Sequence, residues 1–274
     1  MTLIRLENLK IIHNHGFYQE EKVLGQLFIL DLTVDVDMDM VMESHRLEDT
    51  INYGVLAEFV EEVFTRKTLD LIENAGDLVC REVLNRFCQA RSVSLRLKKP
   101  WAPVGKVLDS PQIILERKWE RVFLGLGTNM GDKEENLNKA LDLLKADPGI
   151  RVEKVSSFMT TKAWGVEDQD DFLNGAVEIR TYYRPLELLD KTQAIEKEVG
   201  RTKTYKWGPR MVDLDMLYYG DKIIYEDRLK VPHPYIGERA FVLEPLAEIG
   251  PFFVDPVTRL QVRQMLDGLK AKGL

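Results

Sequence analysis

The sequence of 274 residues has little of what marks secreted, membrane-spanning or nucleic-acid-binding proteins. No stretch reaches the ~18 consecutive apolar residues that a membrane helix needs. Residues 1–12 carry Arg5, Glu7 and Lys10, so they contain no apolar run of the signal-peptide kind. The net charge of −7 argues against general binding to nucleic acid or to a membrane surface. We therefore expect a cytoplasmic protein that binds neither.

Cysteine is also scarce, with Cys80 and Cys88 as the two examples. They fall in a helical pattern and would lie about 12 Å apart along the helix axis, which is too far for a disulfide. No activating partner is visible near either residue. We expect both to be unreactive thiols in a protein core.

Nucleotide-binding glycine motifs are missing as well. Gly125, Gly127 and Gly131 have the spacing G-x-G-x-x-x-G, which is not the dinucleotide fingerprint, and no Walker G-K-[ST] occurs. We interpret these glycines as a strand-to-helix turn.

The first half of the sequence predicts an antiparallel sheet with two helices on one side. Alternating apolar residues predict strands at 3–12, 28–36 and 93–97, and a fourth near 113–115. Apolar stripes at helical spacing begin near Tyr53 and Leu71. One sheet face would then need covering by neighbouring molecules, so we expect a homo-oligomer.

The second half predicts the ferredoxin-like order βαββαβ. Strands are expected at 122–126, near 152–158 and at 173–180, with a helix through Leu137, Ala140, Leu141 and Leu144. A second helix, from Pro185 to Val199, precedes the last strand.

The last predicted strand contains the candidate ligand-binding carboxylates. Val212, Leu214 and Met216 alternate with Asp213 and Asp215. The two carboxylates lie about 6.6 Å apart along one face, so they can converge on hard cations such as Mg²⁺. Cations lie just upstream, around Trp207: Arg201, Lys203, Lys206 and Arg210. A bound polyphosphate and a stacked heterocycle would explain this pattern, and a solvated strand face is the alternative.

Residues 120 to about 256 resemble 6-hydroxymethyl-7,8-dihydropterin pyrophosphokinase. The matching motifs are Gly127-Thr128-Asn129, Val155-Ser156-Ser157-Phe158, Asp171-Phe172-Leu173-Asn174, Trp207-Gly208-Pro209-Arg210, Asp213-Leu214-Asp215, Val231-Pro232-His233 and Arg239.

This resemblance implies transfer of diphosphate from ATP to a pterin alcohol. It implies two Mg²⁺ ions on Asp213 and Asp215, with Arg201 and Arg210 acting catalytically on the phosphates. The implied ATP-binding residues are Gln193, Glu196, Lys203, Trp207, Arg210, Arg228, His233 and Arg239. The implied pterin-binding residues are Thr161, Phe172, Asn174, Trp207 and Phe241.

Residues 1 to about 117 resemble dihydroneopterin aldolase. The motifs are His15-Gly16, Glu21, Gly25-Gln26 with Phe28, Asp49-Thr50, Tyr53-Gly54, Leu71-Ile72-Glu73 and Lys99-Pro100. The resemblance implies a tunnelling fold and a site built between subunits. It gives catalytic roles to Lys99, Tyr53 and Glu21, and substrate binding to Glu73, Ile72 and Glu21. Glu20 is an alternative to Glu21.

No cofactor is implied for the aldolase, because the pterin ring accepts the electrons as an enamine. His13 and His15 suggest a metal, but no third ligand at motif spacing accompanies them.

The leading hypothesis is a bifunctional α+β enzyme, with an aldolase domain at 1–118 and a pyrophosphokinase domain at 119–274. In one alternative the first domain is a noncatalytic oligomerisation module. In another the second domain is a nucleotide-binding regulator.

Overall fold

The computed structural model describes residues 2–36, 46–162, 170–200 and 210–272. The chain divides into two compact units, Met1–Trp119 and Glu120–Leu274. Trp119 belongs with the first unit because its amide donates a hydrogen bond to the Arg91 carbonyl, at 3.1 Å. Each unit contains an antiparallel sheet with helices, which confirms the predicted α+β class.

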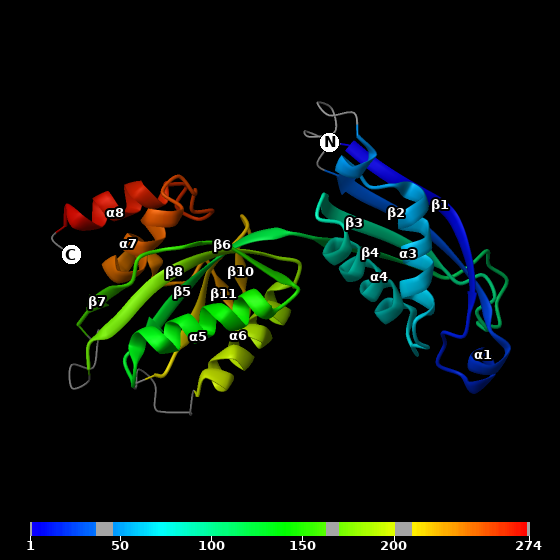
Figure 1. The fold of residues 1–274 in the computed structure, drawn as a ribbon, viewed down its shortest axis with the longest axis horizontal. Helices are drawn as coiled ribbons and strands as arrows, with labels where there is room; N and C mark the ends of the chain where they lie inside the picture. The colour runs from blue at the N-terminus through cyan, green and yellow to red at the C-terminus, as the bar shows by residue number, and fades with distance from the viewer. Residues whose placement is uncertain (1, 37–45, 163–169, 201–209, 273–274) are drawn as a thin grey trace. The chain divides into compact units, whose positions relative to one another are not determined.

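The first unit has the predicted four-stranded sheet in the order β1-β2-β3-β4. Its strands are β1 (Thr2–His13), β2 (Gln26–Val36), β3 (Ala90–Lys98) and β4 (Gln112–Lys118). Helices α3 (Tyr53–Thr65) and α4 (Ile72–Arg86) cover one face, as Figure 1 shows. Alternate residues of β2 point at these helices and are buried: Phe28, Leu30, Leu32, Val34 and Val36.

Two short elements of this unit were not predicted, namely α1 (Gln19–Leu24) and η1 (Leu47–Asp49). The expectation that Cys88 is a core thiol was wrong. Helix α4 ends at Arg86 and Phe87 is extended, so Cys88 lies beyond the helix and is exposed. Cys80 is buried, and burial raises the pKa of its thiol to about 12, which makes it a poor nucleophile.

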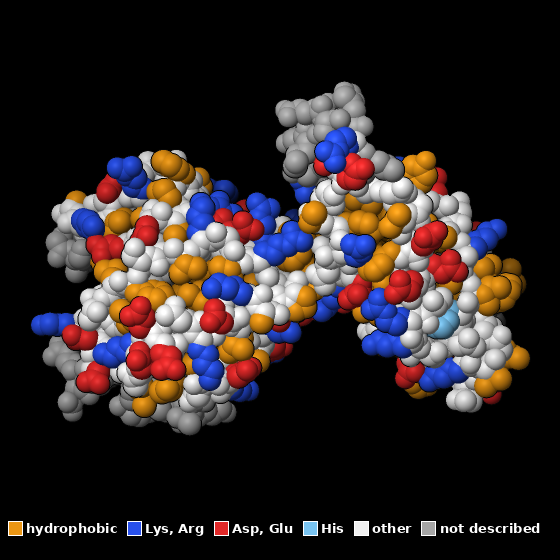
Figure 2. All heavy atoms as spheres, in the orientation of Figure 1, with side chains coloured by type: hydrophobic (Ala, Val, Ile, Leu, Met, Phe, Trp, Pro, Cys, Tyr) orange, Lys and Arg blue, Asp and Glu red, His pale blue; other side chains and the backbone are white. Residues whose placement is uncertain are grey.

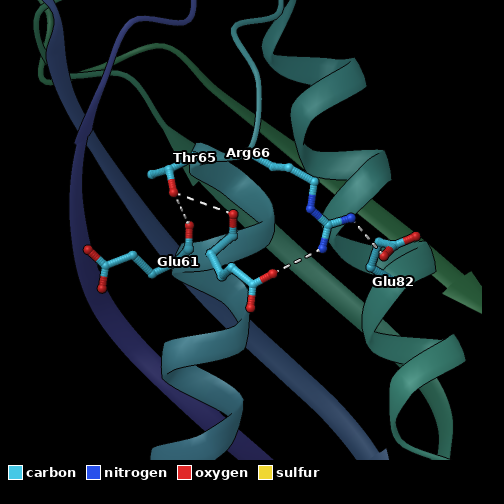
Figure 3. A network of polar contacts seen from close by, with 5 residues as sticks. Glu61, Thr65, Arg66 and Glu82 are labelled. Carbon is cyan, nitrogen blue, oxygen red and sulfur yellow. Dashed lines mark hydrogen bonds and ion pairs between the residues drawn. The ribbon is translucent and has the colours of Figure 1, made fainter.

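The end of α3 is tied to α4 by the polar network in Figure 3. Arg66 bonds Glu62 of α3 at 3.4 Å and Glu82 of α4 at 3.2 Å, and the Thr65 hydroxyl donates to the Glu61 carbonyl at 2.8 Å. Exposed ion pairs of this kind stabilise a protein little, so we expect the network to contribute little to the stability of the first unit.

The second unit has the predicted ferredoxin-like core. Its elements are β5 (Glu120–Thr128), α5 (Lys133–Ala146), β6 (Ile150–Val155), β8 (Phe172–Thr181), α6 (Pro185–Val199) and β9 (Asp213–Tyr219). The sheet order is β6-β8-β5-β9, and an unpredicted short strand, β7 (Met159–Thr161), pairs with β8.

The chain beyond β9 forms elements that the sequence did not predict. These are β10 (Ile224–Tyr225), β11 (Lys230–Val231), η2 (Ile236–Glu238), α7 (Ala240–Ile249) and α8 (Val262–Lys270). Helices α5 and α6 cover one sheet face, and α7 and α8 lie over the other (Figure 1). Leu243 and Leu246 of α7 pack on Phe123 and Leu217 of the sheet, so this part of the sheet is buried on both faces.

Acidic and basic side chains are interspersed over the visible face of each unit in Figure 2. Among the helices of the described residues, none has both the length and the apolar character required to span a bilayer.

Candidate active sites

A cavity of about 280 Å³ opens on the α7 side of the second sheet. Strands β5, β7, β8 and β9, the segment before α7, and α7 itself contribute to its walls. Its lining brings together residues from both predicted sets: Thr161, Phe172, Asn174, Arg210, Asp213, Asp215, His233, Arg239 and Phe241.

Two glycines of β5, Gly125 and Gly127, line this cavity and have no side chains to fill it. Gly127 pairs with Asp213 and Gly125 with Asp215 across β5 and β9. A Cβ atom on Gly127 would come within 3.3 Å of the Asn174 Oδ1 atom. The interpretation of the three glycines as a turn was therefore right only for Gly131, which has φ +60° before α5; the other two lie within β5.

Asp213 and Asp215 lie on the cavity side of β9, while Val212, Leu214 and Met216 are buried. Burial, with the nearby Asp213 carboxylate, raises the pKa of Asp215 to about 7. Two carboxylates in a confined polar site suit a hard cation, since Mg²⁺ is usually held by one or two carboxylates plus water and phosphate oxygens. The donor set therefore fits Mg²⁺.

The start of β9 is held by contacts to both sides. The Arg210 amide donates to Asn129 Oδ1 at 2.8 Å, and the Asn129 amide donates to the Arg210 carbonyl at 3.1 Å. The Arg210 guanidinium pairs with the Asp213 carboxylate. Buried Glu196 accepts a hydrogen bond from the Leu214 amide at 2.9 Å, so it supports the backbone between the two aspartates.

Three residues predicted to bind ATP do not line the cavity: Gln193, Glu196 and Arg228. Gln193 is exposed on α6, and the exposed Arg228 pairs with Asp190. Arg201, Lys203 and Trp207 lie outside the described residues.

The predicted pterin-binding residues in the described part of the chain all line this cavity. The Asn174 amide donates to the Thr161 hydroxyl at 2.7 Å, and Thr161 pairs with Phe172 across β7 and β8. Phe241 comes from the first turn of α7. The cavity lining therefore combines two aromatic rings with an amide and a hydroxyl.

The remaining wall is formed by the segment that leads into α7. Burial and the Arg239 charge lower the pKa of His233 to about 4, so its ring is neutral at physiological pH. Tyr235 and Lys162 also line the cavity, and sequence reasoning missed both. The position of Tyr235 two residues after His233 was the available signal.

The first unit holds a second candidate site around a buried ion pair. Lys99 Nζ lies 2.7 Å from Glu21 Oε1, and the side chains are 12% and 8% exposed, respectively. Glu21 also accepts hydrogen bonds from the Tyr18 amide at 3.0 Å and from Gln26 at 3.2 Å. Burial raises the pKa of the Glu21 carboxyl, but the contact with Lys99 together with these hydrogen bonds outweighs burial and leaves the pKa below its ordinary value. Glu20, the alternative, is exposed.

His15 is fully buried beside this pair and joins three segments. Its Nε2 donates to the Phe64 carbonyl at 2.9 Å, and its Nδ1 accepts from the Leu69 amide at 3.0 Å. Burial lowers the pKa of His15 to about 4, which agrees with a neutral ring. Because both ring nitrogens are used, His15 is not available as a metal ligand.

Tyr53 and Glu73 lie at opposite ends of the helical layer. Tyr53 is the first residue of α3, and Phe64, which bonds His15, lies roughly 16 Å further along that helix. Ile72 and Glu73 begin α4 just after Leu69, at the His15 end. Within one chain, Glu21, Lys99 and the start of α4 therefore lie near His15. The exposed Tyr53 lies at the opposite end of α3.

Comparison with known proteins agrees with this division. Residues 4–116 match the family model described as dihydroneopterin aldolase, and residues 123–251 match 7,8-dihydro-6-hydroxymethylpterin-pyrophosphokinase. The chain is 43% identical to the 2-amino-4-hydroxy-6-hydroxymethyldihydropteridine pyrophosphokinase of Aquifex aeolicus, over 52% of this chain and 88% of that protein. The chain belongs to the hydroxymethyldihydropterin pyrophosphokinase family.

Two further relatives extend this result. The pyrophosphokinase of Bacillus subtilis is 50% identical over 46% of this chain and 76% of that protein. The folic acid synthesis protein fol1 of Schizosaccharomyces pombe is 32% identical over 98% of this chain, which spans 36% of the yeast protein. The region of this chain that aligns with fol1 includes both units.

The pyrophosphokinase domain is thus joined to an aldolase domain in one multifunctional chain of folate biosynthesis, with lyase and diphosphotransferase activities. This result favours the bifunctional hypothesis over the alternative of a noncatalytic first domain.

Proposed function

We propose that this chain catalyses two consecutive reactions at the two sites described. In the first unit, 7,8-dihydroneopterin is cleaved to 6-hydroxymethyl-7,8-dihydropterin and glycolaldehyde. In the second, the hydroxymethyl group receives a diphosphate from ATP, and AMP leaves. The observation that best supports this proposal is one cavity whose lining combines two carboxylates, three cations and an aromatic and amide set: Asp213, Asp215, Lys162, Arg210, Arg239, Phe172, Phe241 and Asn174.

In the second unit, Asp213 and Asp215 would hold Mg²⁺, at two ions per site as the family resemblance implies. When bound, Mg²⁺ offsets the charge of the triphosphate. Arg210 and Arg239 orient the phosphate chain, and neutral His233 can donate a hydrogen bond to it. The chain's contribution is to position reactants and to neutralise charge, which is what phosphoryl transfer chiefly requires.

The same cavity would also hold the pterin. Phe172 and Phe241 provide apolar faces for the bicycle, and Asn174 with Thr161 provides hydrogen-bonding groups at its edge. The hydroxymethyl oxygen then attacks the β-phosphorus of ATP. The bond from that phosphorus to the α,β-bridging oxygen breaks, and AMP leaves while the hydroxyl proton is lost to solvent.

In the first unit, Lys99 would handle the proton of the substrate's side-chain hydroxyl through a water molecule. Glu21 fixes the Lys99 ammonium by the 2.7 Å contact. As the carbon–carbon bond breaks, the pterin ring takes the electron pair, and Tyr53 helps to protonate the resulting carbon. Glu73 is suited to accept two hydrogen bonds from the pterin amino group and ring N–H, beside Ile72.

The aldolase site requires a second copy of the chain, because Tyr53 lies far from Lys99 within one copy. Exposed apolar residues surround the Glu21 end, and these include Phe17, Tyr18, Leu24 and Trp101. Large exposed apolar side chains of this kind mark association surfaces. We therefore include a homo-oligomer, with Tyr53 supplied by a second copy, in the proposal.

A product analysis tests both activities in one tube. The protein is mixed with dihydroneopterin, ATP and Mg²⁺, and glycolaldehyde, AMP and ADP are measured separately. We expect glycolaldehyde, AMP and a pterin diphosphate. AMP that forms only when the hydroxymethyl pterin is supplied would contradict the aldolase activity, and ADP in place of AMP would contradict diphosphate transfer.

Matched variants assign each activity to its unit. Lys99→Ala should lose glycolaldehyde formation and still release AMP from added hydroxymethyl pterin. Asp215→Asn should show the reverse. Loss of both activities in either variant would contradict two independent sites.

A further inference from the structure

We propose that Tyr235 is a positioning residue of the pyrophosphokinase site, whose ring holds the Arg239 guanidinium so that it meets the phosphate chain of the nucleotide. The inference rests on the proposed function of that cavity. Tyr235 belongs to none of the motifs that identified the site, and it acts through Arg239 rather than on the reacting atoms.

The Arg239 guanidinium lies against two aromatic rings. Its central carbon is 4.7 Å from the centre of the Tyr235 ring and 5.7 Å from that of Phe241. Both distances fall within the ~6 Å range of a cation–π contact. All three side chains line the cavity, so the two rings fix where this cation stands in it.

Stacking leaves the binding capacity of the guanidinium intact. A ring contacts the flat face of the group, whereas a phosphate is bound by the N–H groups along its edge. A free arginine side chain loses rotamer entropy when it binds a ligand. A guanidinium that already contacts a ring loses less rotamer entropy when the nucleotide binds.

Tyr235 is itself fixed by its turn. Its amide donates to His233 Nδ1 at 3.4 Å, and its carbonyl accepts from the Glu238 amide at 3.2 Å. The next residue, Ile236, is buried against α7. The Tyr235 and His233 rings lie 5.9 Å apart, so one turn presents both rings and orients the arginine that follows.

Steady-state kinetics of AMP release by the full-length chain test this role. We expect Tyr235→Leu, which keeps bulk without the π-system, to raise KM for ATP by roughly 3- to 10-fold, as for the loss of a partly desolvated cation–π contact. Tyr235→Phe should stay within about 2-fold of the wild type. KM for the pterin and the aldolase rate of the same preparations should not change.

A double-mutant cycle separates positioning from a general structural role. In an Arg239→Ala background, Tyr235→Leu should have no further effect on KM for ATP, because the two residues act as one unit. Additive effects, or a Tyr235→Phe variant as impaired as Tyr235→Leu, would overturn the inference.

Two results distinguish failure of the inference from failure of the proposed function. If Arg239→Ala raises KM for ATP and Tyr235→Leu does not, the nucleotide site stands and the role of Tyr235 is refuted. If Arg239→Ala leaves KM for ATP unchanged, the assignment of Arg239 to the nucleotide fails and the inference fails with it. Should Tyr235→Leu not fold, Tyr235→His provides a smaller ring for the same comparison.

Discussion

Replacing Lys99 by methionine removes the cation from a buried ion pair and leaves the Glu21 carboxylate behind. Breaking such a pair from one side usually costs ~3–5 kcal/mol, because the remaining charge is buried without its partner. Glu21 keeps hydrogen bonds from Tyr18 and Gln26 and also lines an open pocket. We therefore expect the lower end of that range, about 3 kcal/mol of unfolding free energy for the first unit.

The neighbouring lysine provides a matched control. Lys98 pairs with Asp31 at 2.9 Å, but these side chains are 25% and 23% exposed, and Asp31 also accepts the Asn8 amide at 2.8 Å. Lys98→Met makes the same chemical change one residue away and should cost about 1 kcal/mol or less. The difference between the two variants, about 2 kcal/mol, then reflects burial of the carboxylate.

Hydrogen exchange of the sheet amides of the first unit measures both costs in the intact chain. Protein concentration must be held constant, because association contributes to the apparent stability. If Lys99→Met is no more destabilising than Lys98→Met, the Lys99–Glu21 ion pair does not stabilise the first unit by the amount that its burial implies.

The pH dependence of the Lys99→Met effect has a definite sign. In the wild type the folded-state pKa of Glu21 is lowered, so its stabilisation is present above the unfolded-state pKa and is lost as pH falls through the folded-state value. Without Lys99, burial raises the pKa, and the penalty at neutral pH is relieved by protonation. The stability difference from the wild type should shrink between about pH 7 and pH 4. A difference independent of pH would refute this account.

Three further predictions follow from the sites and the core. Asp215→Asn should slow AMP release by about 10³-fold or more, whereas exposed Asp190→Asn should not change it. A 1:1 mixture of Lys99→Ala and Tyr53→Ala chains, each inactive alone, should recover aldolase activity at about a quarter of sites after subunit exchange, because each site draws on two chains; no recovery would place both residues in one chain's site. Tyr218→Phe, which leaves buried Asp255 without a 2.8 Å hydrogen bond, should destabilise the second unit by about 1–3 kcal/mol in the same exchange measurement.

Elements with a strong local period were predictable. The alternation in β2 and the stripe in α3 reflect a single buried face, and a single buried face leaves a readable pattern. The sequence of helix α7 shows no such pattern, because the helix is short and contains Pro245, a residue that usually interrupts a helix. Its Leu243 and Leu246 are held by packing on the sheet, a tertiary contact that outweighs local preference.

The site was predictable where its residues lie close in sequence or belong to a recognisable motif. Asp213 and Asp215 share a strand face, and Thr161 and Asn174 come from adjacent strands. The contribution of Gly125 and Gly127 depends on the register between β5 and β9, which no local pattern reveals. The resemblance implies that Glu196 lies at the nucleotide, and this remains a prediction; its hydrogen bond to the β9 backbone could not be predicted, because a helical period does not show which buried residue reaches a neighbouring strand.

The two sites differ in how their buried charge is balanced. In the first unit, Glu21 has its counter-ion in Lys99, so the chain alone satisfies the pair. In the second, burial and Asp213 leave Asp215 with a pKa near 7, although Arg210 pairs with Asp213. In the proposed function the first site would take Tyr53 from a second copy, but the charges of Glu21 and Lys99 are already paired, whereas the second site favours an added cation. In the proposed reaction, a metal–nucleotide complex would bring both that cation and phosphates for Arg210 and Arg239, so binding of this complex would balance the charges of the second site.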